Sequence, residues 1–579
     1  MKVTIQKILE FHDLFPEEKE LDIRNILKKY NKKHLVLSSH ILSHNYGMAF
    51  IFDKNNPFFS ENSQKYIPEL EQRLNAYRQQ QPCYCTTKTA LELMRLIFSI
   101  PTNDYRNDGN LEDFEYDLFR IILQINENLM EFKSIKELDI ATLTFFARFI
   151  MNDISGQDTH DIFRRQMEYY STLAEFIEKR QDCAKAKINF YTKAGITSMS
   201  EYLKTWLALC VLDIEYQKQH AKGCPVLNLS KIQDIDNTIN RSVIDFLSIN
   251  LDESIPYNSN DTRSRDNNVD YRVFRAHPLI KINSDEYIIY NFPILVERLY
   301  NSLFFDIKES FDDAFNFYNR EFVERTLFQP QILKCLSKKT SMFYPSHEII
   351  LSENKQEEED KQPDFYIREN DNLILFECKA IRLNGKLKDK SDIDELLAIL
   401  KNKLYCSTMN IDKSRGTKKK EEKVGVTQLV QQIKMIDEDT FKWDNNIPLD
   451  VAYYPVIVLE DPRFVTPGIS YIINSWYKSL IEKELPGQMC HPIIIMSIDT
   501  LMQYSHIFRA FGFNFVFNRF FQKTVHYSNN DVTWTFEPLG DFNVFMQENY
   551  KLYTKKKKQL FERHKKVLER NSDNIQDVF

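Results

Sequence analysis

The chain has 579 residues, enough for three to four domains at roughly 150 residues each, which excludes a single small binding module. Only 12 residues are glycine, so folds that need many glycine turns, such as propellers and dinucleotide-binding sheets, are disfavoured. The formal net charge of −7 excludes a uniformly basic nucleic-acid coat. Any site for a polyanion must therefore be local.

The first 250 residues carry a helical pattern. Apolar residues between Leu111 and Met130 recur at three- and four-residue steps, which places them on one helix face. Similar stripes run through 141–151, 163–176 and 202–212. Because this half shows no catalytic constellation, we expect a helical recognition or regulatory region at 1–250. It would bind a protein partner, a second copy or the substrate, and the alternative is structural support.

A polar stretch follows the helical half. Residues 252–268 are rich in Asn, Ser and Asp and cannot bury enough apolar surface to fold alone. The pattern predicts a linker at 251–270 between two halves that fold separately. An α/β domain is expected at 271–545 and a basic carboxy-terminal helix or tail at 546–579.

Helical and strand patterns alternate beyond the linker, which is typical of an α/β domain with a mixed sheet. The expected fold class is thus an α-helical amino-terminal half plus an α/β domain. The expected elements are a hairpin within 278–290, helices over 293–336, strands near Phe365 and Leu373, helices from Ser391, Thr427 and Tyr471, and strands at 451–459 and 492–498.

The two strands near Phe365 and Leu373 flank a polar turn and should form a hairpin. If the turn is centred between Asn370 and Asp371, Asp364 lies directly across from Glu377, with Cβ atoms about 5 Å apart. Strand alternation places Lys379 on the same face as Glu377. Three charged groups therefore converge on one face of an otherwise apolar hairpin.

Two facing carboxylates repel each other, and a hard divalent cation with oxygen ligands relieves that repulsion. We expect Mg²⁺, for which Mn²⁺ can substitute, held by Asp364, Glu377 and the carbonyl of Cys378. Lys379 could orient and activate an attacking water or stabilise charge that develops on a phosphate. Together these groups predict metal-assisted phosphodiester hydrolysis.

Pro363-Asp364 followed by Glu377-Cys378-Lys379 on the next strand resembles the signature of the PD-(D/E)XK nuclease superfamily. The resemblance covers about residues 273–500 and implies a restriction-endonuclease-like domain. It also implies an acidic metal ligand on a preceding helix, where Glu321 and Glu324 stand and Glu324 fits better. A Gln on a following helix is implied as well, and Gln428 is the match.

Two basic segments are candidates for contact with nucleic acid. Residues 382–423 hold twelve basic and seven acidic residues, and Lys418, Lys419 and Lys420 lie in a run that could form a mobile loop along a phosphate backbone. The segment from Lys551 to Arg570 holds nine Lys or Arg and two Glu, including Lys555 and Lys556. Each segment could instead be a solvated loop or terminal helix.

The primary hypothesis is a Mg²⁺-dependent deoxyribonuclease, with a restriction or anti-phage defence role suggested by analogy. The alternative is a non-catalytic nucleic-acid-binding or scaffold subunit with a nuclease-like fold. The nine scattered cysteines, with no CxxC pair, and the lack of an apolar leader or spanning run favour a cytoplasmic protein without membrane contact. The pattern leaves open RNA versus DNA, sequence specificity, endo- versus exonucleolytic action and oligomeric state.

Overall fold

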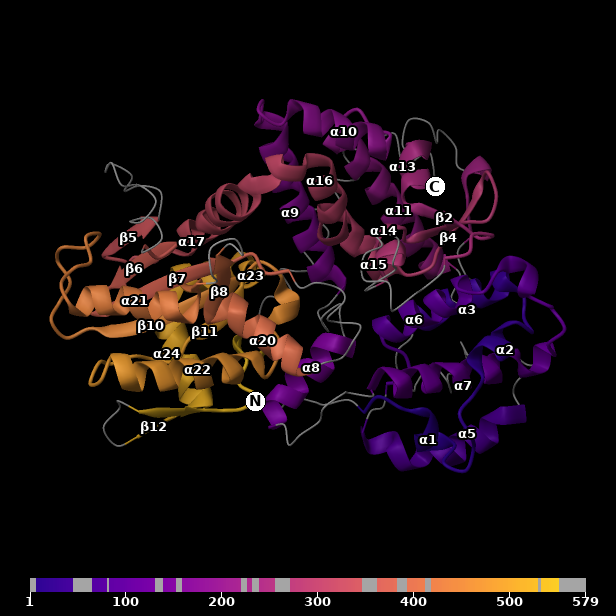
Figure 1. The fold of residues 1–579 in the computed structure, drawn as a ribbon, viewed down its shortest axis with the longest axis horizontal. Helices are drawn as coiled ribbons and strands as arrows, with labels where there is room; N and C mark the ends of the chain where they lie inside the picture. The colour runs from indigo at the N-terminus through magenta and orange to yellow at the C-terminus, as the bar shows by residue number, and fades with distance from the viewer. Residues whose placement is uncertain are drawn as a thin grey trace.

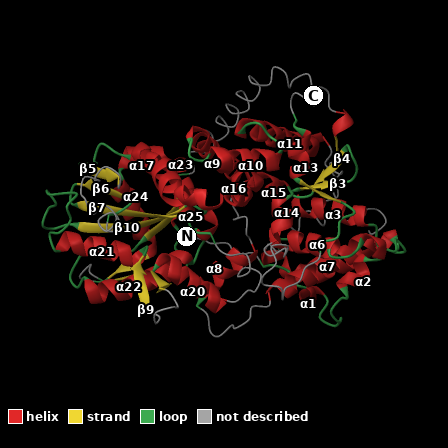
Figure 2. Cartoon of the chain, turned by 45° about the horizontal axis from the view of Figure 1, so that its top comes forward, coloured by secondary structure: helices red, strands yellow, loops and turns green. Residues whose placement is uncertain are grey.

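The computed structural model confirms a largely helical chain that contains mixed sheets (Figures 1 and 2). The amino-terminal helices form the lobe at the lower right of Figure 1. They are α1 Phe11–Leu14, α2 Ile23–Leu27, α3 Lys32–His44, α5 Ile67–Leu74, α6 Thr87–Phe98 and α7 Leu111–Met130.

The structure describes residues 7–44, 65–80, 83–130, 139–151, 159–219, 226–231, 239–255, 271–345, 362–382, 393–411, 418–528 and 533–550.

A second group of helices lies toward the top of Figure 1 beside a small four-stranded sheet, except for the first of them, which lies at the lower centre of the view. The expected stripes at 141–151, 163–176 and 202–212 are all helical, which confirms those predictions. The helices are α8 Ile140–Met151, α9 Thr159–Lys179, α10 Ala184–Ala194, α11 Met199–Gln219, α13 Arg241–Phe246, α14 Arg272–Ala276, α15 Phe292–Glu297 and α16 Leu303–Phe311. The strands are β1 Val226–Asn228, β2 Ser248–Asn250, β3 Leu279–Lys281 and β4 Glu286–Ile289.

A five-stranded mixed sheet forms the α/β part, at the left of both ribbon views. Its order is β11-β10-β7-β6-β5, antiparallel from β5 to β7 and parallel from β7 to β11. Central strands β7 and β10 are buried along nearly their whole length because helices cover both faces, so they read as continuous apolar runs. The strands are β5 Met342–Pro345, β6 Phe365–Glu369, β7 Asn372–Lys379, β10 Ala452–Leu459 and β11 Ile494–Ser497.

Helices α21 and α24 cover opposite faces of this sheet. On β7, Phe376 packs against Phe513 of α24, whereas the next residue, Glu377, is contacted by Gln432 of α21. The remaining elements around the sheet are π-helix η8 Tyr318–Phe328, α17 Gln329–Cys335, α20 Ile393–Leu404, β8 Cys406–Ile411, β9 Lys418–Lys423, α21 Val426–Asp437, α22 Ile469–Glu484, α23 Ile498–Phe511, α24 Phe513–Thr524, β12 Val525–Tyr527, β13 Trp534–Phe536 and α25 Phe542–Asn549.

The polar stretch at 251–270 does not separate two independent folding units, contrary to the sequence-based division. In the small sheet β1 pairs with β4 and β2 pairs with β3. Strands from before and after the polar stretch therefore belong to one sheet. Sequence composition shows that a segment cannot fold alone, but it does not show whether the flanking strands pair with each other. The structure describes this stretch only as far as residue 255.

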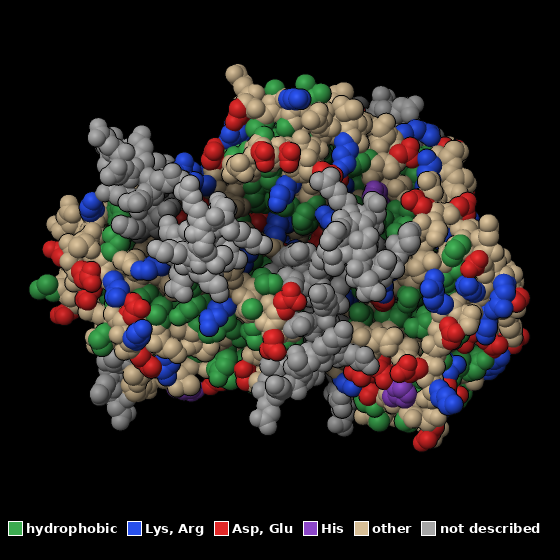
Figure 3. All heavy atoms as spheres, in the orientation of Figure 1, with side chains coloured by type: hydrophobic (Ala, Val, Ile, Leu, Met, Phe, Trp, Pro, Cys, Tyr) green, Lys and Arg blue, Asp and Glu red, His purple; other side chains and the backbone are tan. Residues whose placement is uncertain are grey.

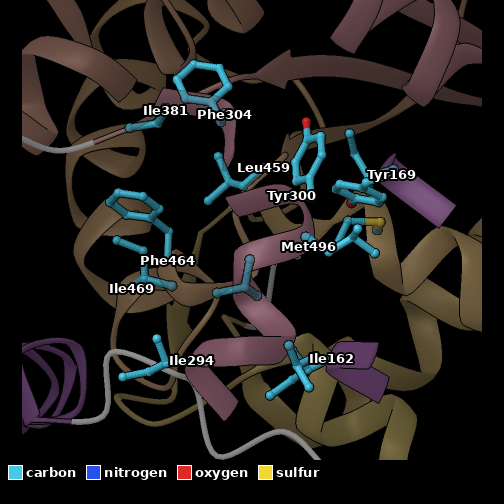
Figure 4. Close-up of a cluster of buried hydrophobic side chains, with 14 of the residues drawn as sticks. Ile162, Tyr169, Ile294, Tyr300, Phe304, Ile381, Leu459, Phe464, Ile469 and Met496 are labelled. Atoms are coloured by element: carbon cyan, nitrogen blue, oxygen red, sulfur yellow. The ribbon is translucent and has the colours of Figure 1, made fainter. Parts of the chain in front are cut away.

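A buried apolar cluster joins the two halves more extensively (Figure 4). Tyr169 of α9 lies beside Tyr300, which belongs to the π-helix η6 Arg298–Ser302, and beside Met496 of the five-stranded sheet. Ile162 of α9 lies at the lower edge of the same cluster. The rings of Tyr169 and Tyr300 meet edge to face with centroids 5.2 Å apart. The amino-terminal helices therefore share a core with the α/β part.

Within the described ranges, no helix has the length and apolar character needed to cross a bilayer.

Gly468 offers a direct test of the contact between α8 and α22. Its φ is +105°, and a Cβ there would lie 2.2 Å from the carbonyl oxygen of Ala141. We expect Gly468→Ala to lower the free energy of unfolding by about 1–3 kcal/mol more than Gly487→Ala. Gly487 is the matched control because its φ is +88° and no atom lies within 4 Å of the added Cβ. Equal destabilisation of the two variants in urea unfolding would contradict this packing.

Candidate active site

The hairpin of β6 and β7 has the predicted register. Phe365 pairs with Phe376 and Glu369 with Asn372, so the turn is the two residues Asn370 and Asp371. Asn370 has a φ of 55°, a left-handed conformation that asparagine tolerates better than most residues. Because the register is set by this turn, Asp364 lies across from Glu377 at the open end of the hairpin.

Three charged groups from the hairpin meet at that end. Glu377 Oε2 lies 3.0 Å from Lys379 Nζ, and Asp364 Oδ2 accepts a hydrogen bond of 2.6 Å from the backbone N–H of Cys378. Glu377 is fully buried, whereas the side chain of Lys379 is 20% exposed. An incoming ligand would therefore reach the site from the side of Lys379.

Helix α21 supplies two glutamines, one turn apart, to the same groups. Gln428 Oε1 accepts a hydrogen bond of 3.2 Å from Lys379 Nζ, so the Gln428 predicted from the sequence does lie at the site. Gln432 Nε2 donates to Glu377 Oε1 at 2.5 Å, and Gln432 is fully buried. Sequence reasoning missed Gln432, although its i+4 spacing from Gln428 places both on one helix face.

Of the two acidic candidates on the preceding helix, the structure brings only Glu324 to the site. The charges of Asp364, Lys379 and Glu377 all act on its carboxyl group. Glu321 points elsewhere, since its Oε2 accepts from Nη1 of Arg180, the residue just after α9, at 2.5 Å and its side chain is 46% exposed. The helix that carries both acids is a π-helix, a rare form that is frequent at functional sites.

Burial and mutual repulsion make these carboxyl groups hard to ionise. Burial, with added repulsion from Asp364 and Glu377, raises the pKa of Glu324 to about 9. Burial raises the pKa of Glu377 to about 8, against the attraction of Lys379, and burial likewise raises the pKa of Asp364. For Lys379 burial acts to lower the pKa, but attraction by Glu377, Asp364 and Glu324 outweighs it, and the net direction is upward.

The donor set suits a hard divalent cation in its chemistry. Glu324, Asp364 and Glu377 offer only oxygen ligands, and burial is the main reason that the pKa of each is raised. As the side chains stand, no group of three or more His, Cys, Asp or Glu in the described ranges is arranged to hold a metal ion. Glu377 has both oxygens engaged in hydrogen bonds, one with Lys379 and one with Gln432.

A second buried polar cluster fixes the start of π-helix η8 beside the site. Arg382 Nη2 donates to Glu460 Oε1 at 2.6 Å and to Tyr318 Oη at 3.1 Å, and its guanidinium lies 3.8 Å from the centroid of Phe304. Glu460 follows β10, and its N–H donates to the carbonyl of Lys379 at 3.1 Å. The cluster thus ties the helix that carries Glu324 to the ends of β7 and β10.

The basic segments differ from expectation where they are described. Lys418, Lys419 and Lys420 begin β9, which pairs antiparallel with β8, so this run is part of a two-stranded ribbon rather than a loop. Ladder hydrogen bonds to β8 explain why the charged run adopts a regular structure. Lys555 and Lys556 lie outside the described residues. Elsewhere, positive and negative side chains are interspersed over most of the face in Figure 3, and several Lys and Arg side chains lie in a hollow near its centre.

No family model, no curated protein and no solved structure matches this chain. Its function is therefore inferred from the residues and their geometry.

The ionisation of Glu324 can be tested through stability. Because its pKa in the folded protein is raised from 4.5 to about 9, the folded state holds the proton more tightly than the unfolded state, and stability falls as pH rises between those values. We expect Glu324→Gln to raise the free energy of unfolding by about 1–3 kcal/mol near pH 9 in EDTA, and by little near pH 5. The measurement is denaturant unfolding at both pH values.

Glu321→Gln is the matched control, since it makes the same change on the same helix at a partly exposed position. Its effect on stability should be small at both pH values. If the stabilities of Glu324→Gln and the unaltered protein change in parallel with pH, Glu324 is not the buried acid described above.

Proposed function

We propose that the chain is a Mg²⁺-dependent nuclease of the PD-(D/E)XK type that hydrolyses phosphodiester bonds in DNA. The observation that carries the proposal is the meeting of Asp364, Glu377 and Lys379 at one end of a buried hairpin, with Glu324 and Gln428 supplied by flanking helices. A salt-bridge cluster on an exposed edge would not need to be buried or to recruit groups from two further helices.

The order of elements gives the proposal independent support. An acidic helix, the antiparallel strands β5, β6 and β7, the glutamine-bearing helix α21 and then the parallel strand β10 follow one another along the chain. The resemblance to the superfamily implies a helix with an acid, a hairpin with the signature, a helix with a Gln and a further strand. A restriction-endonuclease-like domain is accordingly part of the proposal.

Each residue then has a role that its position permits. Asp364, Glu377, Glu324 and the carbonyl of Cys378 would hold Mg²⁺, which when bound supplies charge compensation for a phosphate and a more acidic water. Lys379, whose side chain is 20% exposed, would orient the attacking water or stabilise negative charge on the phosphate. Gln428 positions the Lys379 ammonium and Gln432 positions the Glu377 carboxylate.

The amino-terminal half has a route by which it could regulate the site. Arg180 at the end of α9 binds Glu321, which lies one turn from Glu324 on η8. A partner or a second copy that moved α9 would thereby move the helix that carries a metal ligand. A role in restriction or anti-phage defence, in which cleavage is held back until a trigger binds, fits this arrangement.

One observation favours a second candidate, a nucleic-acid-binding or scaffold subunit that does not cut. Both oxygens of Glu377 already accept a hydrogen bond from a protein group, so a cation would share them with Lys379 and Gln432. A chain that had lost catalysis could keep these contacts for stability alone. The presence of all of Asp364, Glu377 and Lys379 favours the nuclease.

The decisive experiment is incubation of supercoiled plasmid with the protein in Mg²⁺ and in EDTA. We expect nicking in Mg²⁺ alone, and a loss of about 10²-fold or more in rate for Lys379→Ala, because an aligned charged donor at the reacting phosphate contributes that much. Lys185→Ala, an exposed lysine of α10, is the control and should cut normally. If the unaltered protein, Lys379→Ala and Lys185→Ala nick the plasmid equally, Lys379 takes no part in the reaction. If the unaltered protein binds DNA but does not nick it, the result favours the scaffold subunit.

The lysines of β9 can be tested through the salt dependence of binding. If Lys418, Lys419 and Lys420 each neutralise a phosphate, replacing all three with Ala should lower the slope of log affinity against log salt by about 2.7 for duplex DNA. Affinity should fall equally for unrelated sequences, since phosphate contacts carry no sequence information. An unchanged slope would show that these three lysines do not contact DNA.

A further inference from the structure

Two segments that meet around Glu369, at the turn end of the β6–β7 hairpin, carry only positive charge. Residues 329–345, which include α17 and β5, contain three lysines and no acid. Residues 500–528, which include most of α23 and all of α24, contain two arginines, one lysine and no acid. In a chain of net charge −7, such segregation is unexpected, and it places a local positive field where the segments adjoin.

Exposed aromatic rings lie within this positive surface. Phe511 and Phe515 are 42% and 39% exposed, and their rings stack at 20° with centroids 5.4 Å apart. Lys339 Nζ lies 5.5 Å from the centroid of Phe515, and the Arg519 guanidinium lies 5.9 Å from it. Lys338 and Lys339 are both exposed. We call Lys338, Lys339, Phe511, Phe515 and Arg519 the basic-aromatic surface.

A buried carboxylate holds the two segments together beneath this surface. Glu369, at the end of β6, accepts hydrogen bonds from Ser337 Oγ at 3.2 Å and from the N–H groups of Phe513 and Asn514 at 3.1 and 3.0 Å. Glu369 is fully buried, and these donors hold residue 337 and the start of α24 to the end of β6. The surface is therefore fixed in place before any ligand binds.

We propose that the basic-aromatic surface binds single-stranded nucleic acid. Unpaired bases expose faces that can stack on Phe511 and Phe515, while Lys338, Lys339 and Arg519 neutralise the backbone phosphates. A duplex keeps its bases stacked inside and gains only the phosphate contacts. An acidic peptide would use the cations but would leave the aromatic faces without a matching partner.

This surface is separate from the candidate active site and does not depend on cleavage. Glu369 and Asp364 lie at opposite ends of β6, about 16 Å apart at 3.3 Å per residue. If the proposed nuclease function is also correct, the surface would hold an unpaired strand while the site cuts a nearby phosphodiester. Binding assays in EDTA test the surface alone, whereas cleavage assays in Mg²⁺ test the site.

The test is fluorescence anisotropy of labelled oligothymidylate and of a labelled duplex, with the full chain in EDTA. Phe511→Ala with Phe515→Ala should weaken oligothymidylate binding by about tenfold or more and affect the duplex much less. Lys338→Ala with Lys339→Ala should lower the single-strand salt slope by about 1.4. Phe511→Tyr with Phe515→Tyr should preserve binding, because a tyrosine ring stacks equally well.

Lys19→Ala with Lys185→Ala, two exposed lysines in the amino-terminal half, is the charge-matched control and should leave the slope unchanged. Unaltered oligothymidylate binding in the Phe and Lys variants would overturn the proposal. Equal losses for single strand and duplex, or equally strong competition by polyglutamate, would also overturn it, because the surface would then be a general polyanion site. Loss of cleavage with these binding results intact would count only against the nuclease.

Discussion

The burial of three carboxyl groups around one ammonium group is the constraint on which the rest of the site depends. Asp364, Glu377 and Glu324 compete for Lys379, and removing charges from water costs several kcal/mol per ion unless partners compensate. The surrounding structure supplies those partners: the Cys378 N–H, Gln428 and Gln432. An arrangement so costly for stability is more readily explained by a cation or a reaction than by folding.

The sequence predicted the hairpin and its register because both depend on local rules. Asn370 and Asp371 form a two-residue turn, and strand alternation then fixes which side chains share a face. The apolar runs of β7 and β10 were recognisable for the same reason, as was the helical stripe of α7. These predictions needed no knowledge of which segments pack together.

The predictions that failed required information about distant contacts. A polar stretch gives no sign that β1 and β2 pair with strands beyond it, so the division at 251–270 was wrong about shared structure. The charged run of Lys418 to Lys420 forms a strand because it pairs with β8. The sequence of β8 does not itself strongly predict a strand, so this pairing could not be expected from the sequence. Gln432 was missed although its spacing from Gln428 was in the sequence, because the spacing alone does not show that the side chain reaches Glu377.

The π-helical form of η8 has a consequence for how its residues can vary. Each residue of an ordinary α-helix turns the chain by about 100°, so a single deletion that restored regular α-helix would rotate everything on one side of the deletion. Glu324 and Glu321 now face two different partners, Asp364 and Arg180. Restoring the regular helix would put these two acids out of phase with both partners at once. The irregular turn therefore makes the length of this helix, and not only its composition, a condition for the site to exist.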